Sequence, residues 1–411
     1  MAKKETNALE KKDWVSRFNL VGEAKVNDFT YKIDERSNKS DWVYNSINLG
    51  INCGKKHGTV YCELMGGYGA ERDNIIYVHG KKEDSTDDFE NSYTIDWEDR
   101  FDESILEDIG DLCFIKVGLE KTDKDKLFVN KFLTPYDAIT YIKEHLEEGM
   151  VVSVSGNLRY TVYNGLVQCK KEINSVYLST DRKTGEVTTP DKYRATFTQT
   201  MLIDKDSCTR DSLDRDKSSL IIDAYILEKF KEYNGWDLTD NGKVKGGKFV
   251  PLRRQFEFPV DFSTDAGKEK VNMVMNKLFK VKKGVTQITF EGEFVESGAT
   301  VQATMDDVPD DIKELIAMGI YTEEEALAKC SENGSRERRM LILKPMIKMV
   351  GEEGEKKPVI QRVDEKFSED VLIMECLTPK DEDEDDNVDD VDTEETEVAS
   401  DDDSEDWLNA L

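Results

Sequence analysis

Residues 135–178 read PYDAITYIKEHLEEGMVVSVSGNLRYTVYNGLVQCKKEINSVYL, and the fold prediction rests mainly on these residues. Its first third has apolar residues at helical spacing, with a proline suited to the first turn and Gly149 placed to end the last one. From Val151 the period changes to two, so apolar and polar side chains fall on opposite faces of a strand. Asn164-Gly165 is the favoured two-residue hairpin turn, because both residues tolerate positive φ. The stretch therefore predicts a helix followed by a β-hairpin.

The same order of elements recurs later in the chain. Residues 267–279 form a second amphipathic helical pattern, Gly284 ends it, and residues 285–296 alternate. Aligning Gly292 with Gly156 brings the apolar rows of the two strands into register. A glycine in a strand's apolar row often marks a bend or a close backbone approach, which the fourth strand of a five-stranded OB barrel needs. We therefore predict a mainly β (α+β) chain with short helices, folded as tandem OB-fold barrels.

Turn signals and charge runs divide the rest of the chain around these two repeats. The predicted parts are a flexible arm at 1–13, a first OB domain at 14–179 with an insertion at 66–110, a linker at 180–192, a second OB-like domain at 193–378 with a helical insertion at 308–330, and a disordered acidic tail at 379–411. The first insertion opens on a flexible glycine loop at 66–69. In the second domain we expect strands at 193–203, 218–230, 249–260 and 340–349, and an edge strand at 371–377.

Composition limits the class of protein. The chain has 411 residues, and no apolar run approaches the length of a membrane span. Residues 1–20 lack the hydrophobic segment of a signal peptide. The seven cysteines show no paired short spacing, which indicates free thiols in a reducing compartment. We therefore expect a soluble, cytoplasmic protein without a membrane partner.

The formal net charge of −30 is unevenly spread. Residues 381–406 hold 17 acids and no base, which leaves 70 acids against 57 bases, or −13, in residues 1–380. Residues 243–283 carry 11 Lys and Arg against four acids, a balance of +7. Because the local field decides where a polyanion binds, this stretch is compatible with a nucleic-acid partner.

Aromatic and cationic residues interleave at three places. Strand alternation points Trp42, Tyr44 and Tyr61 outward, where they form a stacking platform unless the insertion covers them. Single strands are held by cations that follow the backbone and by rings on which bases stack. The other candidates are Arg159, Tyr163, Lys170 and Lys171 beside the hairpin, and Lys243, Lys245, Lys248, Phe249, Arg253 and Arg254 in the second domain. A solvated lysine loop beside an ordinary core strand is the alternative interpretation of the last group.

No catalytic constellation stands out. Three histidines in the whole chain leave little for a triad or a multi-histidine metal site. The segment 242–248 lacks the Ser or Thr that follows the lysine of a phosphate loop. Cys53, His57 and Cys62 are possible zinc ligands, although both cysteines also fit the inward-facing rows of their strands as buried thiols. The acids lie in loops rather than fixed on rigid elements, which disfavours a two-metal nuclease. We expect no enzymatic activity and no cofactor.

The C-terminus combines a long acidic run with an apolar end. Such a composition predicts disorder in isolation. A purely solubilising tail does not need apolar residues at its tip, whereas an acidic peptide with an apolar tip suits a basic-rimmed hydrophobic pocket. The candidate partner-binding residues are Trp407, Leu408 and Leu411.

Together these features resemble the single-stranded DNA-binding proteins of bacterial and phage replication. The resemblance rests on the helix and hairpin around Gly156, the outward rings and the acidic tail with its apolar tip, and it is clearest over 135–178 and 380–411. It implies that the tail tip recruits a polymerase, helicase, primase or nuclease, in the host cytoplasm if a phage encodes the chain. This chain differs in its larger size and in Glu291 and Glu293 on the presumed outer face of the second hairpin.

The function we predict is to coat single-stranded DNA without strong sequence preference during replication and recombination. Partner proteins would be recruited through the tail. The alternative is an acidic nucleic-acid mimic or regulator that binds a basic protein, which the tail charge supports by itself. The +7 stretch and the outward rings favour the first interpretation, because a mimic needs neither.

Overall fold

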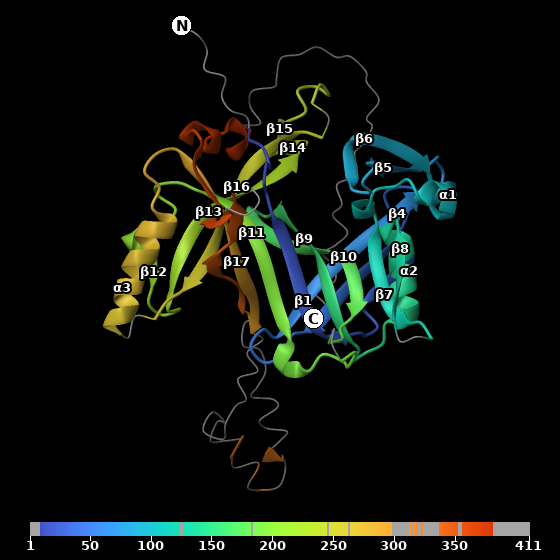
Figure 1. Cartoon of the computed structure of the whole chain (residues 1–411), viewed down its shortest axis with the longest axis horizontal. Helices are drawn as coiled ribbons and strands as arrows, with labels where there is room; N and C mark the ends of the chain where they lie inside the picture. The colour runs from blue at the N-terminus through green and yellow to red at the C-terminus, as the bar shows by residue number, and fades with distance from the viewer. Residues whose placement is uncertain are drawn as a thin grey trace.

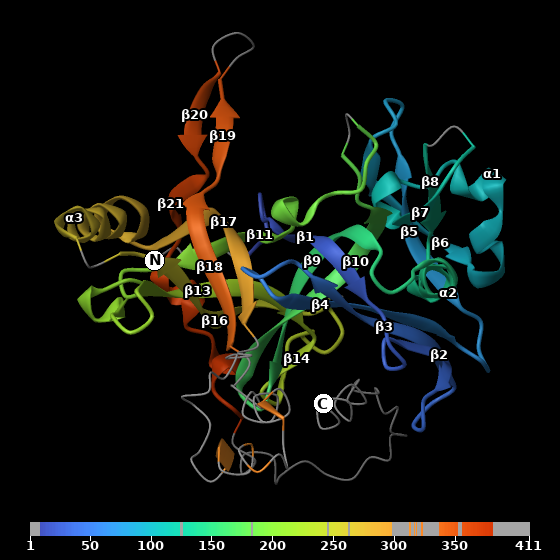
Figure 2. The same cartoon turned by 90° about the horizontal axis from the view of Figure 1, so that it is seen from below.

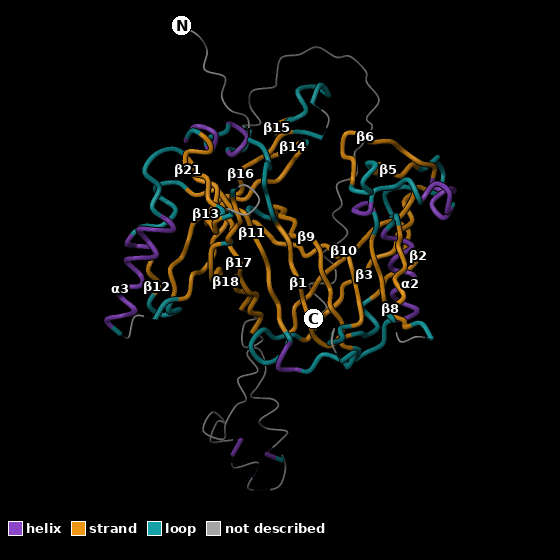
Figure 3. The backbone as a smooth tube through the Cα atoms, viewed as in Figure 1, coloured by secondary structure: helices purple, strands orange, loops and turns teal. Residues whose placement is uncertain are grey.

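The computed structural model describes residues 9–123, 126–181, 184–244, 246–261, 264–297, 337–351 and 356–380, together with 312, 313, 316, 318, 322 and 323. The chain is mainly β with short helices between strands, as the alternating patterns predict (Figure 1, Figure 3). Among these residues, no helix is long and apolar enough to cross a membrane.

Five strands of the first half form a closed barrel. They are β1 (Ser16–Lys25), β3 (Trp42–Asn52), β4 (Thr59–Gly69), β9 (Val151–Tyr163) and β10 (Leu166–Leu178). β1 pairs antiparallel with β3 and β9, β3 with β4, and β9 with β10. A parallel pair between Glu172 of β10 and Glu63 of β4 closes the ring. By position in the barrel, the strand order is therefore 1-2-3-5-4, returning to 1.

Helix α2 (Pro135–His145) packs against β3 and β4 of this barrel. The Thr134 side chain caps it by accepting a backbone N–H of the first turn, where the proline also fits. Asn45, which interrupts the apolar row of β3, is fully buried beneath the helix. Its amide donates to the Tyr136 carbonyl and to Thr140 Oγ1, both at 2.9 Å. The helix therefore satisfies the one polar side chain that its own packing buries in β3.

The second half repeats this circuit of pairings. Its strands are β11 (Arg194–Ile203), β13 (Ser219–Phe230), β16 (Lys248–Pro259), β17 (Val285–Ser297) and β18 (Glu337–Pro345). β11 pairs antiparallel with β13 and β17, β13 with β16, and β17 with β18, while β16 and β18 are parallel. Single residue pairs join β11 to β13 and β16 to β18. Helix α3 (Asp265–Val274) and the π-turn η5 (Met275–Phe279) precede β17, in the place that α2 takes before β9.

The two halves meet where β1 pairs antiparallel with β11. One row of residues crosses four strands at this junction, from Gly156 in β9 through Phe18 and Phe197 to Gly292 in β17. A Cβ on Gly156 would lie 2.9 Å from the Phe18 ring, and a Cβ on Gly292 would lie 2.4 Å from the Phe197 ring. Each glycine therefore leaves room for the aromatic ring of the first strand in its own half.

The remaining elements lie in connections around these strands. In the first half they are β2 (Tyr31–Arg36), β5 (Ile75–Lys81), β6 (Asp87–Asp96), η1 (Trp97–Phe101), α1 (Glu103–Leu106), η2 (Asp111–Cys113), β7 (Ile115–Lys121) and β8 (Leu127–Phe132). Later in the chain they are η3 (Pro190–Lys192), η4 (Arg210–Ser212), β12 (Leu213–Asp214), β14 (Glu232–Tyr233), β15 (Trp236–Asp237), β19 (Ile347–Val350), β20 (Lys357–Ile360), β21 (Arg362–Phe367), η6 (Glu369–Leu372) and η7 (Glu375–Leu377). The predicted helical insertion at 308–330 lies mostly outside the described residues.

Two local predictions are wrong. The glycines at 66–69 are the end of β4 rather than a flexible loop. A Cβ on Gly66 would lie 2.7 Å from the Pro135 ring, so the glycine is there because the strand passes close under α2. The apolar run at 371–377 forms two 3₁₀ turns instead of an edge strand. Its Val371 and Leu372 are buried against Leu202 of β11, and this packing replaces strand pairing.

Candidate nucleic-acid interface

The outer surface of β3 and β4 carries the three rings that alternation points away from the core. Trp42, Tyr44 and Tyr61 are partly exposed, whereas their neighbours Val43 and Val60 are buried. We call this outer surface, with the adjoining outer surface of β9 and β10, the barrel face. The predicted side-chain register of β3 and β4 is therefore confirmed.

The three rings do not form one compact platform. Tyr61 pairs with Gly50, whereas Tyr44 pairs with Gly67 at the other end of the strands. Because Tyr44 and Gly50 are six residues apart in β3, the rings of Tyr44 and Tyr61 are separated by roughly 20 Å along the strand. A Cβ on Gly50 would lie 3.1 Å from Tyr61 Cε1, so the Tyr61 ring lies across the glycine. The rings mark the two ends of a path along the barrel face.

Two lysines that the sequence reasoning did not select border this path. Lys25 of β1 pairs with Gly50, which places it beside Tyr61, and its Nζ lies 3.2 Å from Glu148 Oε1. Lys32 of β2 is exposed and pairs with Ser46, in the middle of β3. The sequence shows period-two alternation in both strands, but it does not show that they pair with β3.

A further ring, Phe29, projects from the turn between β1 and β2 and is 83% exposed. Its backbone N–H donates to Asn27 Oδ1 at 2.9 Å, and the Thr30 N–H donates to the Asn27 carbonyl at 3.0 Å. The Thr30 carbonyl also accepts the Asn48 N–H at 2.9 Å, which ties the turn to the middle of β3. An Asx turn with a large ring at its tip is a local sequence signal, and sequence reasoning could have found it.

The hairpin contributes two cations that face solvent. Arg159 and Lys170 are directly paired across β9 and β10, so their side chains share one surface. Arg159 Nε lies 3.0 Å from Glu172 Oε2, and Lys170 Nζ lies 3.6 Å from Glu63 Oε1. Tyr163, further towards the turn, is 38% exposed. Such exposed ion pairs are worth about 0–1 kcal/mol, so phosphate groups can replace their carboxylates at little cost.

Lys171 and Arg254 lie between the two halves instead. Lys171 Nζ is 3.2 Å from Glu296 Oε1, and both side chains are about a tenth exposed. Its ammonium also lies 4.7 Å from the centre of the Phe294 ring. Arg254 donates through Nη1 to the Val167 carbonyl at 2.7 Å. Tertiary packing therefore uses these two predicted cations to join the hairpin to the second half.

The other described cations predicted in the second half are exposed but spread out. Lys243 is in an exposed turn, and Lys245 lies outside the described residues. Lys248 Nζ lies 2.7 Å from Asp240 Oδ1, and Arg253 Nη2 lies 3.0 Å from Asp223 Oδ2. The hydrogen bond to Asp223 raises the pKa of the Arg253 guanidinium. The structure does not bring these residues together with the barrel face of β3 and β4.

Phe249 is half-buried between two ammonium groups rather than standing free. Lys11 Nζ and Lys229 Nζ lie 5.9 and 5.8 Å from the centre of its ring. Lys11 also pairs with Glu228 Oε2 at 3.0 Å, and burial lowers the pKa of its ammonium. Residues 9–13, expected as part of a flexible arm, are therefore held against the second half in the described structure.

The possible zinc ligands are buried and take part in packing and hydrogen bonding. His57 is buried, and its Nδ1 lies 2.9 Å from the Phe294 carbonyl oxygen. Cys53 and Cys62 are buried in the core of the first barrel, and burial raises the pKa of the Cys53 thiol to about 12. Across the described part of the chain, no cluster of three or more His, Cys, Asp or Glu residues is arranged to hold a metal ion. The tail-tip residues Trp407, Leu408 and Leu411 lie outside the described residues.

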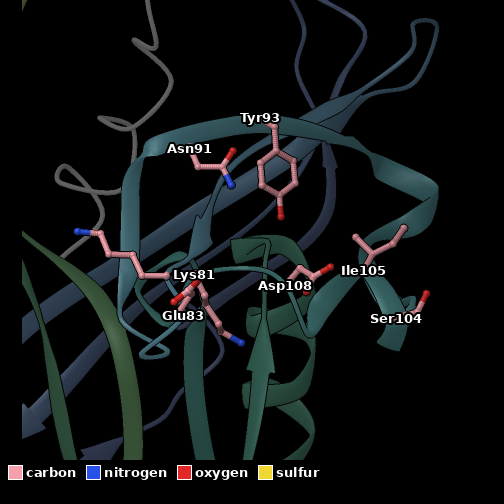
Figure 4. Close-up of a pocket in the computed structure, with 8 residues that line it drawn as sticks. Lys81, Glu83, Asn91, Tyr93, Ser104, Ile105 and Asp108 are labelled. Carbon is pink, nitrogen blue, oxygen red and sulfur yellow. The ribbon is translucent and has the colours of Figure 1, made fainter.

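A hollow lies within the insertion, between the β5–β6 hairpin and α1 (Figure 4). Its lining mixes lysines with acids, and Lys81 Nζ already donates to the Glu107 carbonyl at 2.6 Å. Tyr93 and Asn91 line the same hollow. None of the residues predicted to bind nucleic acid lines it.

No protein-family model matches the chain, and no curated protein is detectably similar to it.

Proposed function

We propose that this protein binds single-stranded DNA without strong sequence preference, on two OB folds in tandem. The observation that carries the proposal is the barrel face, where three rings lie on the outer surface of the second and third strands of a closed five-strand barrel and cations of the neighbouring strands border them. OB folds bind oligonucleotides on this surface and on the adjoining loops. The matching pairing circuit of the second half supports a second OB fold.

The proposed path runs along the barrel face. Bases would stack on Tyr61 and Phe29 at one end and on Trp42 and Tyr44 at the other. Lys25, Lys32, Arg159 and Lys170 would contact phosphates, displacing the carboxylates that pair with three of them. The proposal leaves out Lys171 and Arg254, because their charged groups already pair with Glu296 and with the Val167 carbonyl, in contacts between the hairpin and the second half. Lys243, Lys248 and Arg253 remain candidates for an extension onto the second half.

The role of the tail is also part of the proposal. Its acidic run and apolar tip would recruit proteins of replication or recombination, with Trp407, Leu408 and Leu411 as the contact. The protein would act by coating DNA and recruiting partners, without catalysing a reaction.

An acidic regulator that binds a basic protein is the second candidate function. The observation that favours it is the charge of the insertion, because residues 66–110 carry 14 acids and four bases, or −10. A regulator of this class would bind a basic protein in the absence of DNA and show no affinity for oligo-dT.

The test is a fluorescence-anisotropy titration of labelled oligo-dT at several salt concentrations. We expect log affinity to fall with log salt by roughly 0.7 per contacted phosphate, and single strands to be preferred over duplex. Tyr61→Ala should weaken binding by about 1–3 kcal/mol, the range for one stacked base. Phe101→Ala is the matched control, because that ring is also exposed but lies in the insertion. Equal effects of the two substitutions, or binding that does not respond to salt, would exclude the barrel face.

A further inference from the structure

Three tight turns in the described part of the chain share the dipeptide Asn-Gly. They are Asn164-Gly165, Asn234-Gly235 and Asn241-Gly242, and both residues of each pair have positive φ. The first turn joins β9 to β10 in the first half, and the second joins β14 to β15 in the second half (Figure 2). A fourth pair, Asn333-Gly334, lies outside the described residues. The three turns are therefore matched in sequence and differ in what surrounds them.

An Asn-Gly pair can undergo deamidation, a reaction between its own two residues. The backbone nitrogen of the glycine attacks the side-chain amide carbon of the asparagine, a C–N bond forms, and ammonia leaves with the proton of the attacking nitrogen. Water then opens the resulting cyclic imide at either carbonyl, which gives aspartate or isoaspartate. Glycine favours the attack because it has no side chain beside the nitrogen. Water is the only co-reactant, and the reaction requires that the amide and the N–H group are free to approach each other.

The turn at Asn164 leaves both reacting groups without a hydrogen bond. Asn164 and Gly165 are exposed, and within the described structure neither the Asn164 side chain nor the Gly165 N–H has a hydrogen-bonding partner. A Cβ on Gly165 would meet no atom within 4 Å, so the space around the glycine is open. The strand pair that closes the turn, Tyr163 with Leu166, is exposed as well. The amide and the nitrogen can therefore approach each other without breaking hydrogen bonds of their own.

The turn at Asn234 holds the asparagine side chain in place. Asn234 Nδ2 donates to the Cys376 carbonyl at 3.0 Å and to the Leu377 carbonyl at 3.3 Å. The Asn234 carbonyl also accepts the Lys380 N–H at 3.0 Å, which ties the turn to the end of the described chain. Rotation of the side-chain amide towards the Gly235 nitrogen would break both bonds of Nδ2. The second turn is therefore protected at the group that is attacked.

The turn at Asn241 holds the attacking nitrogen instead. The Gly242 N–H donates to Thr239 Oγ1 at 3.0 Å, and the Asn241 N–H donates to Asp237 Oδ2 at 2.9 Å. The Thr239 hydroxyl donates in turn to Asp237 Oδ1 at 2.5 Å, which fixes its position. Attack on the Asn241 amide would have to break the bond that Gly242 makes. The third turn is therefore protected at the nucleophile, by one hydrogen bond.

We propose that Asn164 is a site of spontaneous deamidation in the native protein, and that hydrogen bonds protect Asn234 and Asn241 from the same reaction. The net contribution of one hydrogen bond corresponds to a factor of about 2–10 in rate. We therefore expect Asn164 to react about 2–10-fold faster than Asn241, which is protected by one bond. It should react about 5–100-fold faster than Asn234, which is protected by two. The modification needs no DNA, so it goes beyond the proposed function.

The consequence of the modification, in contrast, rests on the proposed function. Deamidation replaces a neutral amide by a carboxylate at the tip of the hairpin that carries Arg159 and Lys170. A carboxylate at this position would repel phosphate groups bound to the barrel face, and one exposed charge changes affinity by at most about fivefold. The isoaspartate product also adds a carbon atom to the backbone of the two-residue turn. We therefore expect the deamidated protein to bind oligo-dT more weakly, most clearly at low salt.

The experiment follows the three sites in one sample of the full chain. Native protein is incubated at neutral to mildly alkaline pH and digested with trypsin, and tandem mass spectrometry measures the conversion of each asparagine to aspartate or isoaspartate. The tryptic peptide 160–170 reports Asn164, and the peptide 232–243 reports both protected sites. A parallel incubation in urea is the reference, because unfolding removes the protecting bonds and the three rates should then converge. Thr239→Val is the matched variant, since it keeps the side-chain shape and removes the acceptor of the Gly242 N–H.

We expect Asn164 to react first in the native protein, and Thr239→Val to raise the Asn241 rate by about 2–10-fold without changing the Asn164 rate. A native Asn164 that reacts no faster than Asn234 and Asn241 overturns the proposal. The same order of rates in urea overturns it as well, because flanking sequence rather than folded structure would then set the order.

Asn164→Asp tests the consequence for DNA binding separately. This variant carries the aspartate product, and it should weaken oligo-dT binding by up to about fivefold at low salt. Equal affinity of the variant and the wild type would remove the link to DNA binding. If the wild type does not bind oligo-dT at all, the proposed function fails, and the three deamidation rates still decide whether Asn164 is the reactive site.

Discussion

Lys170 and Lys171 are neighbours in β10, yet the structure gives them different surroundings. Lys170 is 37% exposed and lies 3.6 Å from an exposed glutamate, whereas Lys171 is 11% exposed and lies 3.2 Å from the buried Glu296. Lys170→Met and Lys171→Met each remove one ammonium group and keep a long side chain. Comparing the two variants therefore separates a role in DNA binding from a role in holding the hairpin against the second half.

The size of each effect follows from burial. Removing one partner of a buried ion pair costs about 3–5 kcal/mol, because the remaining charge stays buried. Arg338 Nε lies 3.9 Å from Glu296 Oε2 and partly compensates that charge. We therefore expect Lys171→Met to lower the free energy of unfolding by about 3 kcal/mol. Lys170→Met should cost less than about 1 kcal/mol, since its pair is exposed.

Urea denaturation followed by tryptophan fluorescence measures the stability, and an oligo-dT titration measures binding. Lys171→Met should lower the urea midpoint and leave the affinity of the folded protein unchanged. Lys170→Met should leave the midpoint unchanged and reduce the salt slope by roughly 0.7, the value for one phosphate contact. Adding Glu296→Leu to Lys171→Met should recover most of the lost stability, because no unpaired charge is then buried. Equal midpoints for the two single variants, or no recovery in the double variant, would refute the reasoning.

Three further predictions test other parts of the structure. Gly156→Ala should destabilise the protein by about 1–3 kcal/mol, because the added methyl group would lie 1.8 Å from the Glu172 carbonyl oxygen; an unchanged thermal midpoint would contradict that close approach. Burial raises the pKa of the Cys53 thiol to about 12 and also raises the pKa of the Cys62 thiol, so neither should react with a maleimide in the native protein near pH 7. Mass spectrometry of labelled peptides checks this, and rapid labelling of the native protein would show that the two thiols are accessible to solvent. Two lysines hold the pKa of Asp111 at about 2, below the roughly 3.9 of an unfolded carboxyl group, so its stabilising effect should be complete above about pH 4 and lost as the pH falls towards 2. Because that side chain is 43% exposed, Asp111→Asn should cost under about 1 kcal/mol at neutral pH, and acid denaturation should show the two proteins converging near pH 2.

The local elements were predictable from the sequence, because the patterns that specify them are periodic and short-range. Helical spacing before Val151 and period-two alternation after it predicted α2 and the β9–β10 hairpin, and the alignment of Gly292 with Gly156 identified the repeat. Alternation also assigned Trp42, Tyr44 and Tyr61 to the outer surface. The exposure of Phe29 could have been predicted as well, since its Asx turn is formed by residues adjacent in the sequence.

Which strands are neighbours and which charges remain exposed follows from the tertiary packing and was not predictable from the sequence. Lys170 and Lys171 look alike in sequence, and the packing of the second half against the hairpin buries one and leaves the other in solvent. The sequence placed Gly66 in a loop, whereas in the structure it lies in β4 because α2 packs closely over the strand. Lys25 joins the barrel face because β1 pairs with β3, a contact between distant residues. Such contacts depend on long-range packing, which leaves no periodic trace in the local sequence.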